Sequence, residues 1–257
     1  MATPRLDAEV LLARVLGRPR AYLIAHAEQT IDATAAAQYQ ALLTRRAQGE
    51  PVAYLTGERE FWSLALEVNP DVLIPRPETE LAVERCLALR ADPATIADLG
   101  TGSGAIALAL ALERPEWRII ATDCSAAALR VARANARRHA LRNVEFLQGD
   151  WCAPLRAHRF DLLVSNPPYI AASDPALKAL RFEPAAALSP GQTGMEALQR
   201  VVLQATAVLV SGGALVLEHG ANQAADVALA LVAAGFARVR CHSDLAGRAR
   251  VTEAQWP

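Results

Sequence analysis

The chain has 257 residues, of which 53% are hydrophobic and 21% charged, and its formal net charge at pH 7 is −1. This apolar content excludes a disordered chain, and the length fits one large domain or a small domain beside a standard one. Acids and bases are interspersed, so the chain lacks the basic footprint of a protein that grips a long stretch of duplex nucleic acid. We therefore expect it to recognise a small molecule or a protein.

The four cysteines lie far apart and form no CxxC or Cys/His cluster: Cys86, Cys124, Cys152 and Cys241. We predict ordinary buried thiols in a reducing cytosol and no structural metal site. The N-terminus carries charges where a signal peptide needs an apolar core, and no apolar run approaches the length of a membrane span. The sequence thus predicts a soluble, cytoplasmic protein without a metal.

The N-terminal residues show helical periodicity. Apolar residues recur at helical spacing from Leu6 to Leu16 before Gly17, and a second such stretch runs from about Ala33 to Ala47. No strand-like alternation interrupts them, so we predict a small helical domain over residues 1–66. Residues 67–80 contain three prolines and predict a stiff, extended connector, followed by a helix from about Glu78.

Strand-like and helical segments alternate after residue 94. The predicted strands are 95–99, 117–122, 143–147, 160–165, 214–218, 238–242 and 249–255, and the predicted helices are 105–113, 125–140, 195–210 and one ending near 234. The last two strands have no helix between them, which favours an antiparallel end. The pattern predicts an α/β fold over residues 81–257, with a doubly wound, mostly parallel sheet covered on both faces.

A glycine-rich loop, Asp98-Leu99-Gly100-Thr101-Gly102-Ser103-Gly104, joins the first of these strands to its helix. Glycine lets the backbone turn tightly and approach a ligand, and an acid such as Asp123 at the end of the next strand commonly binds ribose hydroxyls. With Ala105 the loop also satisfies a dinucleotide pattern. By itself the loop cannot distinguish a nicotinamide dehydrogenase from an S-adenosylmethionine (AdoMet) enzyme.

Two features favour AdoMet over a dinucleotide. Asp98 would repel a pyrophosphate but suits the cationic end of a methionine moiety. After the third strand, Asp150 can accept a hydrogen bond from an exocyclic amine, and the indole of Trp151 can cover an adenine face. Trp151 could equally be an ordinary, partly buried aromatic residue.

The fourth strand ends in Asn166-Pro167-Pro168-Tyr169, at the edge where such sheets bind ligands. A residue before proline is extended, and two prolines fix the turn that follows. The turn then offers two acceptors, the Asn166 side-chain oxygen and the Pro167 carbonyl, beside the ring of Tyr169. This set matches a planar –NH₂ group, which has two donors and a flat π-system.

The same set suits methyl transfer to an amide or aromatic amine. Two acceptors orient the poorly nucleophilic nitrogen, and both hydrogen bonds strengthen as positive charge develops on it during transfer. The reaction needs no covalent nucleophile or metal, and we assign no general base. We therefore predict an amino-group methyltransferase with Asn166, Pro167 and Tyr169 as catalytic residues.

Several further segments carry a family resemblance: 49–57 (GEPVAYLTG), 59–62 (REFW), 74–80 (IPRPETE), 98–104, 166–169, 181–184 (RFEP) and 217–220 (LEHG). With these, nearly the whole chain resembles the protein-(glutamine-N5) methyltransferases of peptide chain release factors, the HemK/PrmC family. The NPPY turn alone is shared with DNA adenine and some RNA methyltransferases. The Pro-Arg-Pro-Glu-Thr-Glu connector is far more discriminating.

The resemblance implies a seven-stranded, Rossmann-like class I AdoMet methyltransferase whose helical domain helps to dock a release factor. It implies AdoMet contacts from Gly100, Thr101, Gly102, Ser103, Gly104, Asp123, Trp151 and Asn166, and a cradle for the glutamine of the Gly-Gly-Gln tip from Asn166, Pro167, Pro168 and Tyr169. We expect a monomer without stable nucleic-acid binding. The stretch Arg76–Glu80 either shapes the pocket or only starts a helix.

Three other functions fit less well. A nucleic-acid exocyclic-amine methyltransferase of the N6-adenine type would use the same NPPY chemistry, but the charge and the lack of a basic, aromatic-interleaved stretch argue against it. An inactive AdoMet-binding module would need a damaged site, and every motif position is intact. A nicotinamide dehydrogenase leaves NPPY unexplained.

Overall fold

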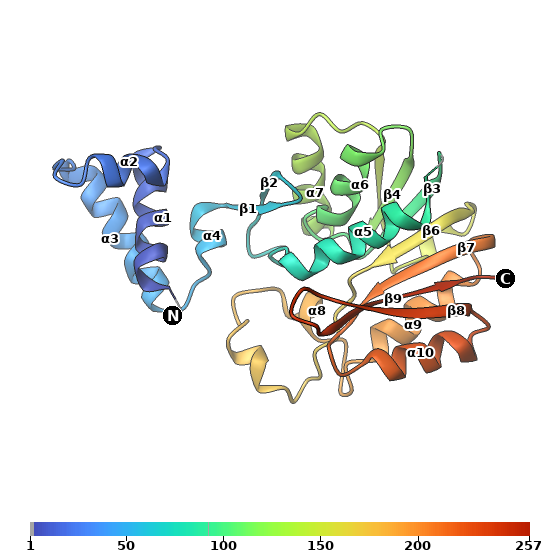
Figure 1. Ribbon diagram of the computed structural model, residues 1–257. Helices are drawn as coiled ribbons and strands as arrows, with labels where there is room; N and C mark the ends of the chain where they lie inside the picture. The colour runs from blue at the N-terminus through green and yellow to red at the C-terminus, as the bar shows by residue number, and fades with distance from the viewer. Residues whose placement is uncertain (1–2, 92) are drawn as a thin grey trace. The chain divides into compact units, whose positions relative to one another are not determined.

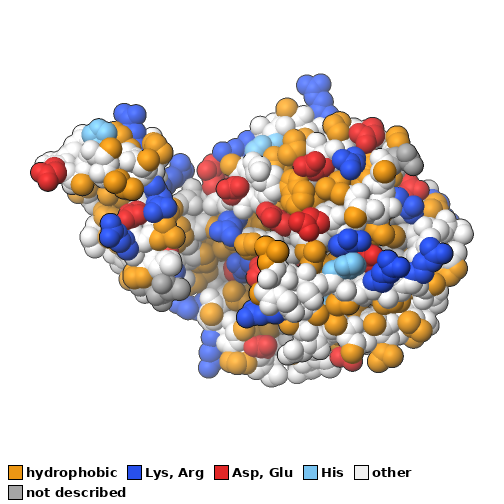
Figure 2. Space-filling view, in the orientation of Figure 1, with side chains coloured by type: hydrophobic (Ala, Val, Ile, Leu, Met, Phe, Trp, Pro, Cys, Tyr) orange, Lys and Arg blue, Asp and Glu red, His pale blue; other side chains and the backbone are white. Residues whose placement is uncertain are grey.

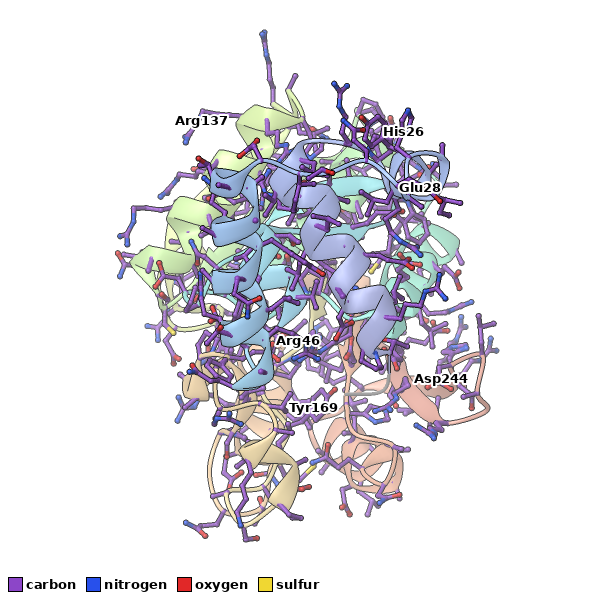
Figure 3. The ribbon with its side chains drawn as sticks, turned by 90° about the vertical axis from the view of Figure 1, so that its left-hand side faces the viewer. His26, Glu28, Arg46, Arg137, Tyr169 and Asp244 are labelled. Atoms are coloured by element: carbon purple, nitrogen blue, oxygen red, sulfur yellow. The ribbon has the colours of Figure 1, made fainter. Side chains whose placement is uncertain are left out.

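The computed structural model describes residues 3–91 and 93–257, which form a smaller compact unit ending at Glu58 and a larger one from Arg59 to Pro257. The smaller unit contains α1 (Pro4–Leu16), α2 (Arg20–Ala25), α3 (Ala33–Ala47) and α4 (Val52–Thr56). Arg46 near the end of α3 (Figure 3) forms an ion pair with Asp7 of α1, at 2.8 Å. The prediction that these residues are helical is confirmed, whereas the assignment of residues 1–66 to a partner-binding domain stays a prediction.

A two-stranded hairpin follows, formed by β1 (Glu58–Phe61) and β2 (Leu64–Glu67). The helical prediction up to residue 66 is wrong here. The turn residues Trp62 and Ser63 both have positive φ, 52° and 60°. Glycine or asparagine usually occupies such turn positions, so the sequence carries no ordinary hairpin signal. The backbone N–H of Trp62 donates to Glu80 Oε1 at 3.0 Å, which ties the hairpin to the helix after the connector.

The larger unit is built on a seven-stranded sheet with the order β5-β4-β3-β6-β7-β9-β8 (Figure 1). Its strands are β3 (Thr95–Leu99), β4 (Arg118–Asp123), β5 (Val144–Gln148), β6 (Phe160–Ser165), β7 (Leu209–Glu218), β8 (Ala237–Ser243) and β9 (Ala249–Gln255). The first five in this order pair in parallel, and β9 is antiparallel to both of its neighbours. The predicted doubly wound sheet and its antiparallel end are confirmed.

Helices cover both faces of this sheet (Figure 1). One face packs against α5 (Glu80–Leu89), α6 (Ala105–Glu113) and α7 (Ala126–Arg138), and the other against α9 (Glu196–Ala205) and α10 (Ala224–Ala233). Successive strand residues point to opposite faces, so Ile96 joins the first core and Ala97 the second. The central strands β3, β4 and β6 are therefore buried along most of their length, as expected of a sheet covered on both sides, whereas the edge strand β8 is largely exposed.

Two element boundaries in the larger unit differ from the sequence prediction by more than two residues. The helix predicted over 195–210 ends at Ala205, and β7 begins at Leu209 rather than 214. The pairing with β6 shifts register between Phe160 and Leu162, opposite the pair Gly212 and Gly213, and Gly212 has a φ of +77°. Glycines in a strand commonly mark such a bulge. Here they interrupt the strand-like sequence pattern, so the first half of β7 was not recognised from the sequence.

The connector is extended but firmly held. Val72 and Ile74 are buried, and the segment ends in a short 3₁₀ turn, η1 (Pro77–Thr79), before α5. The backbone N–H of Ile74 donates to Glu183 Oε2 at 3.0 Å, and Arg76 forms an ion pair with the same carboxylate. Glu183 lies in a chiefly irregular region between β6 and α9 with two short helical turns, η3 (Pro175–Lys178) and α8 (Ala185–Leu188), and a third, η2 (Ala153–Leu155), lies earlier between β5 and β6. The connector is thus fastened to the segment that follows the NPPY turn.

Cys86 and Cys152 are buried as predicted, but Cys124 and Cys241 are exposed. No helix among the described residues is long and apolar enough to cross a membrane, and no cluster of three or more metal-ligating side chains occurs among them. On the face of the larger unit shown in Figure 2, basic and acidic side chains are intermixed.

Candidate active site

Four neighbouring parallel strands end at one edge of the sheet, and each is followed by residues singled out in the sequence. Gly100 follows β3, Asp123 ends β4, Trp151 follows β5 and Asn166 follows β6. The chain runs from β3 towards β4 on one side and reaches β6 on the other, which makes this edge the topological switch point where such sheets bind ligands.

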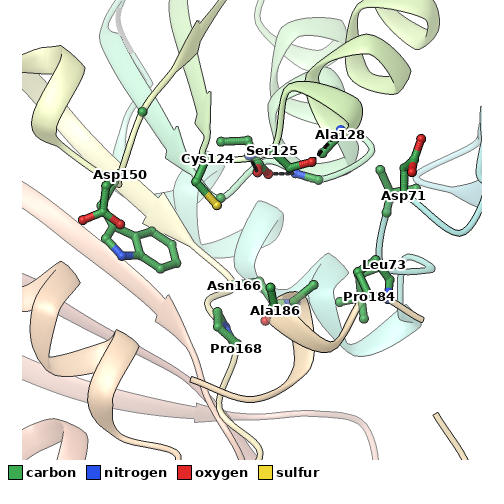
Figure 4. Close-up of a pocket in the computed structure, with 17 residues that line it drawn as sticks. Asp71, Leu73, Cys124, Ser125, Ala128, Asp150, Asn166, Pro168, Pro184 and Ala186 are labelled. Carbon is green, nitrogen blue, oxygen red and sulfur yellow. Dashed lines mark hydrogen bonds between the residues drawn. The ribbon is translucent and has the colours of Figure 1, made fainter. Parts of the chain in front are cut away.

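A pocket of about 210 Å³ opens at this edge (Figure 4). Its walls include Gly100, Gly102, Asp123, Asp150, Trp151, Asn166 and Pro168, together with Asp71, Val72 and Leu73 of the connector and Pro184, Ala186 and Ala187. Figure 4 shows Asp150 and Asp71 on opposite sides, with Asn166 and Pro168 between them. Residues 71–73 and the 184–187 segment were not predicted as pocket walls, because segments without strand or helix periodicity give no indication of where a loop packs. The Arg76–Glu80 stretch, which was weighed as shaping the pocket, is not among its walls.

The glycines of the loop serve different purposes. Gly100 has a φ of +77°, and a Cβ there would lie 2.9 Å from Trp151 Cζ3, so only glycine lets the indole lie against the loop. A Cβ on Gly104 would lie 3.1 Å from Leu108 Cδ1, so this glycine permits close packing of α6. Gly102 has a φ of +57° and open space around it. Of the three, Gly100 and Gly102 line the pocket.

Thr101 and Ser103 are buried beneath the loop, outside the pocket walls. The Thr101 hydroxyl donates to Asp98 Oδ2 at 2.6 Å, and the Ala107 N–H donates to the same oxygen at 3.2 Å. Asp98 is only 1% exposed, and this burial raises its pKa to about 7. Asp98 therefore fixes the glycine-rich loop and the first turn of α6 through hydrogen bonds to Thr101 and Ala107.

Asp123 faces the pocket from the end of β4. Its Oδ2 accepts from the Gly102 N–H at 2.9 Å, and its Oδ1 accepts from the Ser125 N–H at 2.8 Å. Each carboxylate oxygen keeps a further lone pair, so two additional donors can be bound. Cys124 and Ser125, which the sequence did not single out, line the pocket beside it.

The aromatic wall is Trp151, whose backbone has a positive φ of 49°. Its carbonyl accepts from the Thr122 hydroxyl at 3.0 Å, which helps to hold this unfavourable conformation. The indole lies against Gly100 and lines the pocket, so Trp151 is more than an ordinary core residue. Asp150 is exposed beside it.

The NPPY turn begins at a fixed point. The hydroxyl of buried Ser165 donates to the Leu99 carbonyl at 2.6 Å, and Asn166 follows with its Nδ2 donating to Thr79 Oγ1 at 3.2 Å. No described residue donates a hydrogen bond to Asn166 Oδ1 or to the Pro167 carbonyl. Pro168 lines the pocket, whereas Pro167 is buried.

Tyr169 is held by its two polar ends. Its hydroxyl donates to Glu218 Oε1 at 3.4 Å, and its carbonyl accepts from Gln223 Nε2 at 3.1 Å. Burial, followed by the nearby Glu218 charge, raises the pKa of Tyr169, so the phenol is neutral. The ring is not among the walls of this pocket.

Glu218 ends β7 and is 1% exposed. Burial raises its pKa to about 7, while hydrogen bonds from Thr79 and Tyr169 and the charge of Arg250 oppose the rise. Neither Thr79 nor Glu218 was assigned a role from the sequence, although they lie in the stretch 76–80 and in the segment 217–220 that were noted there. The available signals were an acid at the end of an apolar strand and a threonine within the discriminating connector.

Comparison with known proteins decides the family. Residues 1–57 match the PrmC N-terminal domain and residues 79–191 match the methyltransferase small domain. The chain is 48% identical to the release factor glutamine methyltransferase of Escherichia coli, over 97% of this chain and 91% of that protein. For the enzyme of the same name from Xylella fastidiosa the identity is 50%, over 98% and 94%. The chain belongs to the release factor glutamine methyltransferase family.

Family membership confirms the resemblance seen in the sequence and makes the chain a methyltransferase. Solved structures add the fold: a methyltransferase from Pyrococcus furiosus has a TM-score of 0.60 at 17% identity, covering 83% of this chain and 96% of that one. A 16S rRNA N2 G1207 methyltransferase from T. Thermophilus has a TM-score of 0.58 at 20% identity, covering 78% and 50%. The AdoMet methyltransferase fold expected from the sequence is therefore confirmed.

Proposed function

We propose that this enzyme transfers a methyl group from AdoMet to the side-chain nitrogen (N5) of the glutamine in the Gly-Gly-Gln tip of peptide chain release factors. One observation carries the substrate chemistry: Asn166 Oδ1 and the Pro167 carbonyl are two acceptors without a donor among the described residues, in a turn whose Asn166 and Pro168 line the pocket. The curated relatives, by their names, act on a release factor glutamine.

The pocket residues fit AdoMet. Asp123 has lone pairs for two ribose hydroxyls, the Trp151 indole offers a face for the adenine, and Gly100 and Gly102 let the ligand approach the loop backbone. Asp150 lies where it can accept from the adenine amine. When bound, AdoMet supplies an electrophilic methyl group. Thr101, Ser103 and Gly104 belong to the same loop but do not line the pocket, and their direct contact with AdoMet stays a prediction.

A carboxamide is the group that the turn selects. Its two N–H donors match Asn166 Oδ1 and the Pro167 carbonyl, and Pro168, which lines the pocket, limits the plane of the amide. Stacking on the ring of Tyr169, which does not line this pocket, stays a prediction. With both hydrogens held, the nitrogen lone pair is directed away from the acceptors. Charge that builds on the nitrogen during transfer strengthens both hydrogen bonds, so these acceptors stabilise the transition state more than the ground state.

The deciding experiment offers methyl-labelled AdoMet with either an intact release factor or a variant whose tip glutamine is alanine. We expect label in the intact factor alone. Label in both factors would show that the glutamine is not the acceptor, and label only in added RNA or DNA would favour the N6-adenine type of activity. We further infer that the enzyme acts as a cytoplasmic monomer without a metal, with the helical unit contacting the release factor.

A further inference from the structure

We propose that Asn135 is a positioning residue for AdoMet, because it joins two walls of the pocket that lie apart in the chain. One wall is the glycine-rich loop, of which Gly100 and Gly102 line the pocket, and the other is the connector, which contributes residues 71–73. Asn135 lies on α7 and is not itself a pocket wall. The inference rests on the proposed binding of AdoMet in this pocket and explains how the two walls are held at a fixed separation.

Asn135 is a polar residue in the interior of a helix, and it is 0% exposed. Asparagine is a poor helix former, and a buried amide costs free energy unless its polar atoms are hydrogen-bonded. Its Oδ1 accepts from the Glu67 N–H at 2.7 Å. Its Nδ2 donates to the Glu67 carbonyl at 3.0 Å and to the Ser103 carbonyl at 2.9 Å. All three partners are backbone groups outside α7, so this side chain does more than fill the core.

The direction of the amide is fixed by the backbone groups that it meets. A backbone N–H only donates and a carbonyl only accepts, so Oδ1 must face the Glu67 N–H and the two Nδ2 hydrogens must face the carbonyls. Asn135 therefore pairs with Glu67 as a residue of a neighbouring strand would, with one hydrogen bond in each direction. The second hydrogen is left for Ser103, so one amide joins two backbone segments in a single orientation.

On one side the amide fixes the start of the connector. Glu67 ends β2 and precedes the connector residues 71–73 that line the pocket. After these residues, the Ile74 N–H donates to Glu183 Oε2 at 3.0 Å. The connector wall is therefore held at both ends, by Asn135 before it and by Glu183 after it.

On the other side the amide fixes the glycine-rich loop. Ser103 is 3% exposed, so its carbonyl needs a partner within the protein. The N–H one helical turn further on, that of Ala107, donates to Asp98 Oδ2 at 3.2 Å. Asn135 supplies a donor to the Ser103 carbonyl, directly beside the pocket residue Gly102. A ligand that contacts both the loop and the connector thus depends on this amide for the distance between them.

Asn135→Ala removes the three hydrogen bonds, and His139→Ala is its matched control. His139 follows α7, and its Nε2 donates to the Ala65 carbonyl of β2 at 3.0 Å, so it reaches the same hairpin but not the loop. We expect the AdoMet dissociation constant, measured by calorimetry, to rise roughly tenfold in Asn135→Ala and to stay within about twofold in His139→Ala.

The kinetic constants separate positioning from a general loss of structure. At saturating AdoMet, kcat and the KM for the release factor should stay close to those of the unaltered enzyme in both variants, because the amide acts on the AdoMet walls alone. Equal AdoMet dissociation constants for the two variants would overturn the inference. A parallel rise in the KM for the release factor in Asn135→Ala would overturn it as well.

Hydrogen exchange on the unaltered enzyme tests the same link even if Asn135→Ala does not fold. Glu67 is not a pocket wall, so bound AdoMet can slow the exchange of its N–H only through the walls that Asn135 joins. We expect saturating AdoMet to slow this amide roughly threefold or more, and to leave the Trp62 N–H, which donates to Glu80, unchanged. An unchanged rate at Glu67 would contradict the link. An enzyme that binds no AdoMet or labels no release factor would instead refute the proposed function.

Discussion

Asn166 is the residue on which the proposed chemistry depends most directly. In Asn166→Ala one of the two free acceptors is lost, while Gly100, Asp123 and Trp151 remain in the pocket. Because the lost hydrogen bond is strongest in the transition state, we expect the methylation rate to fall roughly 10²- to 10³-fold. AdoMet binding, followed by calorimetry, should change only a few fold. A rate near that of the unaltered enzyme would refute the amide cradle.

Gly100 offers a second test at the level of single residues, with Gly102 as a matched control. Both have positive φ, 77° and 57°, so alanine is strained at either position. A Cβ on Gly100 would also lie 2.9 Å from the Trp151 ring, whereas Gly102 has nothing within 4 Å. We therefore expect Gly100→Ala to weaken AdoMet binding at least tenfold more than Gly102→Ala. Equal dissociation constants for the two variants would show that the indole does not wall the AdoMet site.

Among the elements, the connector gains its fixed position from Glu183. In Arg76→Ala the Glu183 carboxylate, which is 3% exposed as a side chain, keeps only the Ile74 N–H as a partner among the described residues. Removing one partner of a largely buried ion pair leaves an uncompensated charge, so we expect a loss of about 1–3 kcal/mol in the free energy of unfolding. The loss is measured by urea denaturation, from the unfolding transition of the larger unit.

Arg118→Ala is the control for this change. Arg118 forms an ion pair with Glu145 at 3.3 Å, but these side chains are 57% and 51% exposed. Exposed pairs are worth about 0–1 kcal/mol, so this variant should be close to the unaltered protein. Similar losses in both variants would mean that the Arg76–Glu183 pair does not secure the connector.

The sequence predicted regular elements well and contacts between irregular ones poorly. The strands of the sheet and the placement of Gly100, Asp123, Trp151 and Asn166 at one edge follow from strand–helix alternation, which fixes where parallel strands end. The hairpin at Trp62 and Ser63 was missed because its turn uses neither glycine nor asparagine. Partners such as Thr79 and Glu218 depend on how distant loops pack, and no local periodicity encodes that.

At the scale of the whole molecule, two buried carboxyls link stability to pH. Asp98 and Glu218 each have a pKa of about 7, above their ordinary values of 3.8 and 4.5. The folded state therefore holds these protons more tightly than the unfolded chain does. Their contribution to stability is complete below the unfolded pKa values and is lost as the pH rises through 7.

Glu218→Gln should reveal this linkage in a thermal unfolding series between pH 5 and pH 8. Each unit by which a folded pKa exceeds the unfolded value corresponds to about 1.4 kcal/mol. We expect the variant to gain stability relative to the unaltered enzyme as the pH rises, with the difference levelling off above pH 8. A difference that is constant across the series would contradict the raised pKa. A variant that is more stable but slower would show that the buried charge is kept for activity.

The hydrogen bond from Ser165 to the Leu99 carbonyl has a consequence for the reaction coordinate. Leu99 and Ser165 are paired residues of adjacent parallel strands, and the glycine loop and the NPPY turn leave the sheet immediately after them. Adjacent strands lie about 4.8 Å apart, a spacing set by backbone hydrogen bonds and hardly adjustable by side chains. With AdoMet at the glycine loop and the glutamine at the NPPY turn, as proposed, the separation between methyl donor and acceptor is set by the stiff middle of the sheet. The spacing of the strands would then set the distance between the two substrates, and the side chains would set only their orientation.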